Sequence, residues 1–344
     1  MSHLPQRKEK NCLNCGTQVI GHYCHNCGQE NIEPKESVWH LVSHFFQDIT
    51  HFDGKFFTSL KDLIFKPGFL SKEYIVGRRA SYLNPIRMYL FTSAIFFLIF
   101  FSLYKFDEKS INVSPSGYGM RYEDMAKMDS AKLDSFSRKI NDGKPLTLPE
   151  LKDSMSKTNF TIAPGNYRSR KEYDSLLKAG VKKHNWFERQ LVYKNLELKE
   201  KYNSDGKLIM IALLNRFMHS LPQMLFVLLP LFALILKLVY VRRKQFYYVD
   251  HIIFTIHLYI FIFLVMLITF GISKLRSFLH WEWLKYFVLI FILSIFFYFY
   301  KALRNFYKQR RAKTILKYFI LLFLFLITSV FTFIIFFFFS IFAL

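Results

Sequence analysis

The residues best suited to chemistry are the four cysteines of the chain, which lie near its N-terminus as two Cys-x-x-Cys pairs. Cys12 and Cys15 form the first pair, Cys24 and Cys27 form the second, and eight residues separate the pairs. Four thiolates are soft ligands that can close a tetrahedral site around Zn²⁺. A module this small has almost no apolar core, so the metal would supply its folding energy. The spacing therefore predicts a structural zinc site with all four cysteines as ligands.

Spacing alone leaves two other uses of these cysteines open. Two disulfides are expected if this end of the chain faces an oxidising compartment. A redox-active Cys-x-x-Cys motif usually lies within a βαβ pattern, which the surrounding sequence lacks. If zinc is bound, four thiolates leave it no open coordination position, so we expect no catalytic role for the metal.

A second group of chemistry-bearing residues, Asp250, His251 and His257, lies at the start of an apolar segment. Asp250 and His257 are seven residues apart, so a helix places them on nearly the same face. Ionisable groups at membrane depth commonly handle protons, ions or metals. The alternative is structural: an ion pair at the helix end, beside Arg242 and Arg243, and a hydrogen bond from His257 to a neighbouring helix.

Three arginines, Arg78, Arg79 and Arg87, stand just before the first long apolar segment. One interpretation makes them contacts for an anionic lipid head group. The other, which we favour, makes them anchors that only satisfy the excess of basic residues on the cytoplasmic side.

The composition indicates a bilayer rather than an aqueous environment for much of the chain. Hydrophobic residues make up 52% of the 344 positions, and phenylalanine alone accounts for 41. The net charge of +22 would suit nucleic-acid binding, but basic loops between membrane spans explain the same excess. We therefore expect the lipid bilayer to be the main partner, and the charge distribution argues against a nucleic acid.

The elements that must position these residues follow from hydrophobic periodicity. Apolar residues recur at helical spacing over 38–49 and 56–65, and Pro67-Gly68 ends the second run. Both runs are too short to cross a bilayer, so residues 37–87 are expected to lie along the membrane surface or to pack under the membrane domain.

One span is predicted at 88–104, and a four-span domain is predicted at 216–344. Its apolar segments are about 221–241, 252–272, 284–300 and 318–342. Between the first span and this domain, residues 105–215 form a polar insert, with a helical stretch expected over 173–202.

The loops predict the orientation. Residues 242–244 are Arg-Arg-Lys, and residues 301–317 hold seven basic residues and no acidic one, whereas the loop between them is poorer in charge. Because short basic loops stay inside, the N-terminus is expected in the cytoplasm, and the insert and the C-terminus outside it. A reducing cytoplasm would also keep the thiolates available for zinc.

Several motifs resemble those of one bacterial membrane family. They are the double Cys-x-x-Cys-Gly pattern, His51-Phe52-Asp53-Gly54-Lys55-Phe56-Phe57, Lys66-Pro67-Gly68-Phe69 and Tyr74-Ile75-x-Gly77-Arg78-Arg79-x-x-Tyr82-x-x-Pro85. The family is catalogued as domain of unknown function 3667. The likeness is close over 12–104 and looser over about 221–263, where Asp250 stands in place of the family's longer glutamate. The resemblance implies a multi-pass, zinc-ribbon protein of the bacterial inner membrane, and it implies no activity.

Together these features predict an all-α fold: a polytopic bundle of about five transmembrane helices with a small N-terminal zinc ribbon at residues 1–36. We expect the ribbon to recruit or sense a cytosolic protein partner, with the bundle as its anchor. The alternative is a small transporter or channel-like bundle that uses Asp250, His251 and His257. A membrane-embedded enzyme ranks third, because no second cluster of nucleophile, acid or metal ligands completes a site. No residue pattern indicates an oligomeric state.

Overall fold

The structure is a computed structural model of the chain. It describes residues 7, 9–32, 55–104, 129–140, 162–165, 167, 169–181, 183–203 and 205–344. The chain divides into two compact units, which are described separately. The first comprises Met1–Leu103 and Pro222–Thr332, and the second comprises Tyr104–Leu221 and Phe333–Leu344. The helix expected over residues 38–49 lies outside the described residues.

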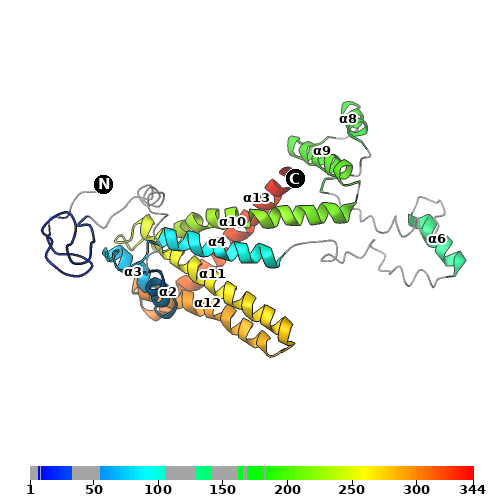
Figure 1. Ribbon diagram of the computed structural model, residues 1–344. Helices are drawn as coiled ribbons and strands as arrows, with labels where there is room; N and C mark the ends of the chain where they lie inside the picture. The colour runs from blue at the N-terminus through cyan, green and yellow to red at the C-terminus, as the bar shows by residue number, and fades with distance from the viewer. Residues whose placement is uncertain are drawn as a thin grey trace. The chain divides into compact units, whose positions relative to one another are not determined.

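Five helices are long and apolar enough to cross a membrane (Figure 1). They are α4 (Pro85–Leu103), α10 (Gly206–Val239), α11 (Tyr248–Leu279), α12 (Leu284–Tyr307) and α13 (Arg311–Phe342). The described residues contain no β-strand beyond two isolated bridges near the N-terminus. The prediction of an all-α fold with about five spans is therefore confirmed.

Helix α11 is the central element of the first unit. Two thirds of its most apolar window (67%) is buried, against 11–33% for the other four spans. It packs against α4 and α12, and Phe96 of α4 stacks on Phe263 and Phe270 of α11 at ring-centroid distances of 4.8 and 5.7 Å. Apolarity alone does not explain this position, because α13 is more apolar than α11 (mean hydropathy 2.9 against 2.6) and is the least buried of the five spans.

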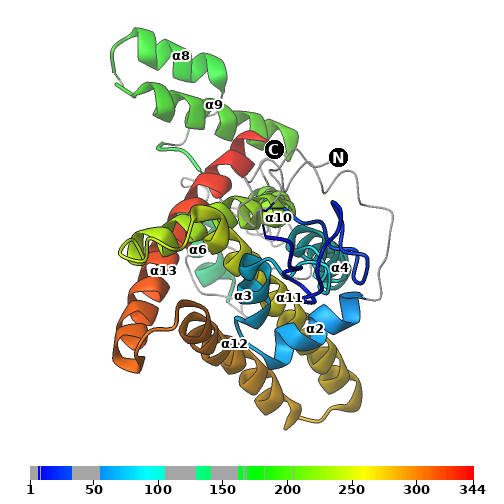
Figure 2. The same cartoon turned by 90° about the vertical axis from the view of Figure 1, so that its left-hand side faces the viewer.

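Two short helices, α2 (Lys55–Phe65) and α3 (Phe69–Val76), pack against α11 and, through α3, against α12, as Figure 2 shows for this region. The Tyr298 hydroxyl of α12 donates to Leu63 O at 2.8 Å, and Asn305 Nδ2 donates to Pro67 O at 2.9 Å. The first bond satisfies a carbonyl in the last turn of α2, and the second satisfies a carbonyl of the turn between α2 and α3. These contacts tie the approach segment to the bundle.

Helix α3 was not expected from the sequence. It is only eight residues long, and a glycine with positive φ stands at each end: Gly68 at 75° and Gly77 at 96°. It has no separate polar and apolar faces, because Ser71 and Glu73 are buried together with Leu70 and Tyr74. Burial among other helices, rather than amphipathic periodicity, stabilises it.

The second unit contains α6 (Ser130–Ile140), α8 (Arg170–Lys178) and α9 (Trp186–Lys201). The helical stretch expected over 173–202 is thus interrupted at Gly180, which has a φ of 70°. Ser169 caps α8, while Asn185 and Glu188 form a capping box at the start of α9. The two helices enclose a small core in which Tyr173 is fully buried and its hydroxyl lies 2.8 Å from His184 Nδ1.

The spans begin or end beyond their apolar segments. Helix α10 starts at Gly206, about fifteen residues before the segment predicted from Leu221, and α12 continues to Tyr307 instead of Tyr300. Hydropathy marks the part of a helix that suits lipid and gives no signal for where the backbone hydrogen bonding stops.

Candidate metal centre and its docking loop

Residues 9–32, here called the cysteine module, consist of two similar knuckles related by a shift of twelve residues. In each knuckle the N–H of the first cysteine donates to a carbonyl five residues later: Cys12 to Thr17 at 2.9 Å, and Cys24 to Gln29 at 2.8 Å. Each knuckle closes with one antiparallel bridge, Asn11 to Gln18 and Tyr23 to Glu30. The shared backbone geometry brings both Cys-x-x-Cys pairs to the same point.

The four sulfur atoms converge on one site. The Sγ atoms of Cys12, Cys15, Cys24 and Cys27 all lie within 4.8 Å of one another. Cys12 to Cys27 and Cys15 to Cys24 are the close pairs, at 3.5 Å each, far longer than the S–S bond of about 2.05 Å in a disulfide. Tetrahedral thiolate ligands at about 2.3 Å from a metal are about 3.8 Å apart. The geometry therefore fits a four-cysteine metal site and not two disulfides.

The thiols of the site differ in their surroundings. Hydrogen bonds from the Thr17 side chain and backbone lower the pKa of the exposed Cys15 to about 6. Burial raises the pKa of Cys27 to about 11. One ligand is thus largely a thiolate at neutral pH, whereas another gives up its proton only when a cation takes its place.

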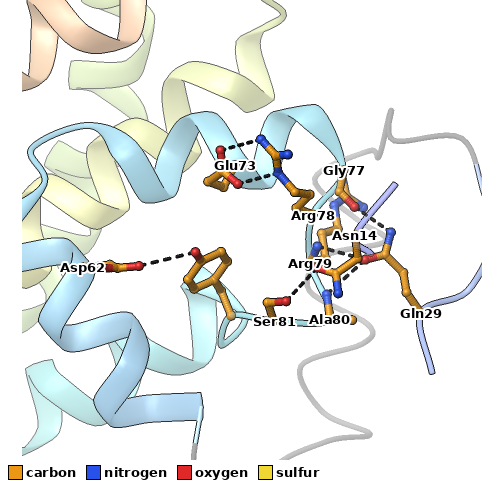
Figure 3. A network of polar contacts seen from close by, with 10 residues as sticks. Asn14, Gln29, Asp62, Glu73, Gly77, Arg78, Arg79, Ala80 and Ser81 are labelled. Atoms are coloured by element: carbon orange, nitrogen blue, oxygen red, sulfur yellow. Dashed lines mark hydrogen bonds and ion pairs between the residues drawn. The ribbon is translucent and has the colours of Figure 1, made fainter. Parts of the chain in front are cut away.

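The cysteine module docks on the loop between α3 and α4 (residues 77–84), here called the docking loop, and Figure 3 draws the contacts. Gln29 Nε2 donates to Gly77 O at 2.6 Å. Its Oε1 accepts from the backbone N–H groups of Arg79 and Ala80, both at 3.1 Å. Ser81 Oγ donates to Asn14 Oδ1 at 2.8 Å. Four hydrogen bonds therefore connect the residues around the metal site to the segment that leads into the first span.

The three arginines predicted as lipid contacts or anchors have different surroundings. Arg78 Nη2 donates to the buried Glu73 at 2.8 Å, which raises the pKa of Arg78, and its Nε lies 2.5 Å from the other carboxylate oxygen. The guanidinium of Arg79 lies 4.5 Å from the centre of the Tyr74 ring. Arg87 is half-buried in the first turn of α4. Arg78 and Arg79 thus contact the α3–α4 region itself.

The residues of the predicted polar membrane cluster have four different hydrogen-bond partners. Asp250 Oδ2 accepts from Tyr247 N at 2.7 Å and caps α11. His251 Nδ1 lies 2.6 Å from the Tyr307 hydroxyl of α12. His257 Nδ1 lies 2.9 Å from Ile253 O and 3.0 Å from Ser71 Oγ of α3. The structure therefore links Asp250 to its own helix end and the histidines to neighbouring helices, and the hydrogen bonds do not join the three into one site.

Sequence reasoning missed Gln29, Asn14, Glu73 and Ser71. The sequence contains one hint for Gln29. The twelve-residue shift between the two knuckles places it at the position equivalent to Thr17. Its partners are backbone atoms some fifty residues away, which no local pattern reveals. Glu73 and Ser71 lie on the unpredicted α3, so their burial had no sequence signal.

Comparison with known proteins adds one finding. No curated protein and no solved structure matches the chain. Residues 53–97 match the family profile described as "Protein of unknown function (DUF3667)". This segment contains α2, α3 and the docking loop, and it ends within α4. The resemblance seen in the motifs is thereby confirmed for residues 53–97, the part of the chain that matches this family.

Proposed function

We propose that the protein is a membrane-anchored, zinc-binding interaction or sensing module. In this proposal Zn²⁺ occupies the four-cysteine site as a structural ion, because thiolates in tetrahedral spacing suit it. The cysteine module faces the cytoplasm of a bacterium, and the helices hold it at the inner membrane. The basic loops at 242–244 and 301–317 support this orientation.

The docking of Gln29 is the observation that carries the proposal. Gln29 lies two residues after the metal ligand Cys27, and its amide binds three backbone groups of the α3–α4 loop. A module that unfolds without metal cannot keep this amide in place. Gain or loss of the metal therefore changes the hydrogen bonding of the loop that enters α4.

Surface features of the cysteine module suit a protein partner. Ile20 and Tyr23 are 86% and 56% exposed, although both are large and apolar or aromatic. Separately, a cavity of about 400 Å³ is lined by Cys27, Gln29 and residues of the docking loop. Exposed aromatic side chains such as Tyr23 are common anchors in protein interfaces.

The test compares two variants of the full-length protein in detergent. Cys12→Ser is expected to lose the metal, measured by elemental analysis, and to lose the protection of the Ala80 amide against hydrogen exchange. Gln29→Ala is expected to keep the metal and lose the same protection, because Gln29 Oε1 is the acceptor of that amide. Gln18→Ala, a glutamine of the same module without a bond to the loop, serves as the matched control.

The outcomes separate the parts of the proposal. Loss of a crosslinked protein partner in Cys12→Ser, with normal membrane insertion, supports the interaction role. If Cys12→Ser keeps every crosslinked partner and the loop keeps its protection, the module neither recruits nor signals. If the metal that copurifies with the wild type is not zinc, the proposed identity of the ion is wrong, whereas the proposal about Gln29 docking is unaffected.

A further inference from the structure

A second cavity lies away from the cysteine module, between the α2–α3 turn and the C-terminal end of α12. Its volume is about 650 Å³, within the range of about 300–1,000 Å³ for small-molecule sites. The polar side chains that line it are Lys66, Lys72, Arg304, Asn305, Lys308 and Gln309. Four of these six are cations, and none of the described residues that line the cavity is acidic.

Three of the four cations have no ion-pair partner among the residues that the structure describes. Lys66 forms an ion pair with Asp62 at 2.9 Å. Within the described part of the chain, Lys72, Arg304 and Lys308 have no carboxylate at ion-pair distance. Cations around one recess repel one another, and the recess concentrates their positive potential. A bound anion would remove that cost.

The backbone that shapes the recess is held firmly. Gly68 has positive φ, and its Cα packs so tightly that an added Cβ would lie 2.7 Å from Ala302 O. Asn305 Nδ2 fixes the turn by donating to Pro67 O at 2.9 Å. Helix α3 begins at Phe69 on the rim, and the amino end of a helix adds partial positive charge. The recess is thus built by tertiary contacts between two segments far apart in sequence.

Its place in the chain suggests where the anion comes from. Helix α12 has Trp281 and Trp283 before its first residue and Arg304 and Lys308 at its other end. Tryptophans and basic residues at the two ends of a span mark the two interfaces of a bilayer. Lys72 and Arg304 are half-buried and Lys308 is exposed, so the charges remain accessible from the interface.

We propose that this recess binds a phosphate-bearing anion, either the head group of an anionic lipid or free phosphate. The cations Lys72, Arg304 and Lys308 hold the phosphate oxygens. Gln309 Oε1 is buried without a hydrogen-bond partner among the described residues, and it can accept from a hydroxyl or ammonium group beside the phosphate. The site is separate from Arg78, Arg79 and Arg87 and independent of the metal.

The experiment uses the purified full-length protein in detergent, mixed with phosphatidylglycerol or with phosphatidylcholine, and counts bound lipid by native mass spectrometry. The wild type is expected to retain phosphatidylglycerol in preference to phosphatidylcholine. The double variant Lys72→Gln, Arg304→Gln is expected to bind it roughly tenfold more weakly or worse, since each cation near the surface contributes to anionic-lipid affinity. The double variant Arg311→Gln, Lys313→Gln removes the same charge outside the recess and should bind as the wild type does.

Inorganic phosphate distinguishes the two sources. Binding of inorganic phosphate detected by calorimetry, lost in Lys72→Gln, Arg304→Gln, assigns the site to free phosphate. Phosphatidylglycerol binding that inorganic phosphate does not displace assigns it to a lipid head group. Binding of neither probe by the wild type overturns the proposal, as does an equal loss of lipid in the control variant, which would mean diffuse attraction. If the double variant elutes as an aggregate, the exposed Lys308→Gln replaces it and must weaken binding.

Discussion

At the scale of single residues, the two knuckles of the cysteine module have similar backbones and different outward side chains. Thr17 is short, and its hydroxyl lies 3.3 Å from Cys15 Sγ, where it stabilises the thiolate. Gln29 occupies the equivalent position in the second knuckle, and its longer side chain reaches the α3–α4 loop. The same position thus contacts a cysteine of the metal site in the first knuckle and the docking loop in the second.

Metal loading is expected to release protons. Because burial raises the pKa of Cys27 to about 11, this thiol is protonated in the metal-free module at pH 7, and the metal must displace that proton. Affinity should therefore increase as the pH rises from 6 to 8. Titration calorimetry of the metal-depleted protein in two buffers of different ionisation enthalpy measures the number of protons. An affinity that is constant over this pH range would contradict the expectation.

At the scale of elements, α3 depends on its two ends more than on its sequence pattern. Gly77 N–H donates to Tyr74 O at 3.1 Å, and the following Arg78 N–H donates to Glu73 O at 3.0 Å, so two of the four orphan carbonyls at the C-terminal end are satisfied. Gly68 makes the closest backbone approach, to Ala302 of α12. The position of this short helix is thus set by two glycines and a neighbouring helix.

Gly68→Ala is expected to destabilise the first unit by about 2–4 kcal/mol, the sum of a left-handed conformation for alanine and a forced displacement at Ala302. Gly180→Ala is the matched control, because Gly180 also has positive φ (70°) and its Cβ would meet no atom within 4 Å. This control should cost about 1 kcal/mol. Thermal unfolding in detergent measures both. Equal shifts in Tm for the two variants would show that the close contact between Gly68 and Ala302 does not contribute to the loss of stability.

The sequence predicted the elements that a pattern of residue types marks along the chain, namely long apolar runs and paired cysteines. The five apolar segments and the two Cys-x-x-Cys pairs are confirmed as five span-length helices and one cluster of sulfurs. Helix α3 and the Gln29 contacts were missed because they depend on packing between segments distant in sequence. The hydrogen-bond partners of Asp250, His251 and His257 were likewise not predictable, since Tyr307 and Ser71 come from helices whose register the sequence does not give.

At the scale of the whole molecule, the two units are defined by the contacts within each. The first contains α11, the most buried of the five spans, and the cysteine module. The second contains the polar helices α8 and α9 with their own small core. Helices α10 and α13 each have residues in both units, so the unit boundary falls inside two spans. The division therefore follows the contacts within each unit and not the ends of the helices.

Reporter fusions test the orientation proposed for the chain. With five spans and a cytoplasmic N-terminus, a reporter inserted at Gly180 and one fused after Leu344 should both give an external signal, and one before Met1 an internal signal. Alkaline phosphatase and green fluorescent protein, active on opposite sides of a bacterial inner membrane, provide the two readouts. An internal signal at Leu344 with an external one at Gly180 would mean that one of the last four helices does not cross.

The contacts of Gln29 carry a consequence for sequence variation. Its amide bonds only main-chain atoms of Gly77, Arg79 and Ala80, so it recognises the shape of the loop and not the side chains on it. Substitutions at 79 and 80 that keep this shape leave all three bonds available. A change at Gly77, whose φ of 96° turns the chain toward the module, alters the shape itself. The contacts of Gln29 therefore constrain the curvature of the loop and place no requirement on the side chains at 79 and 80.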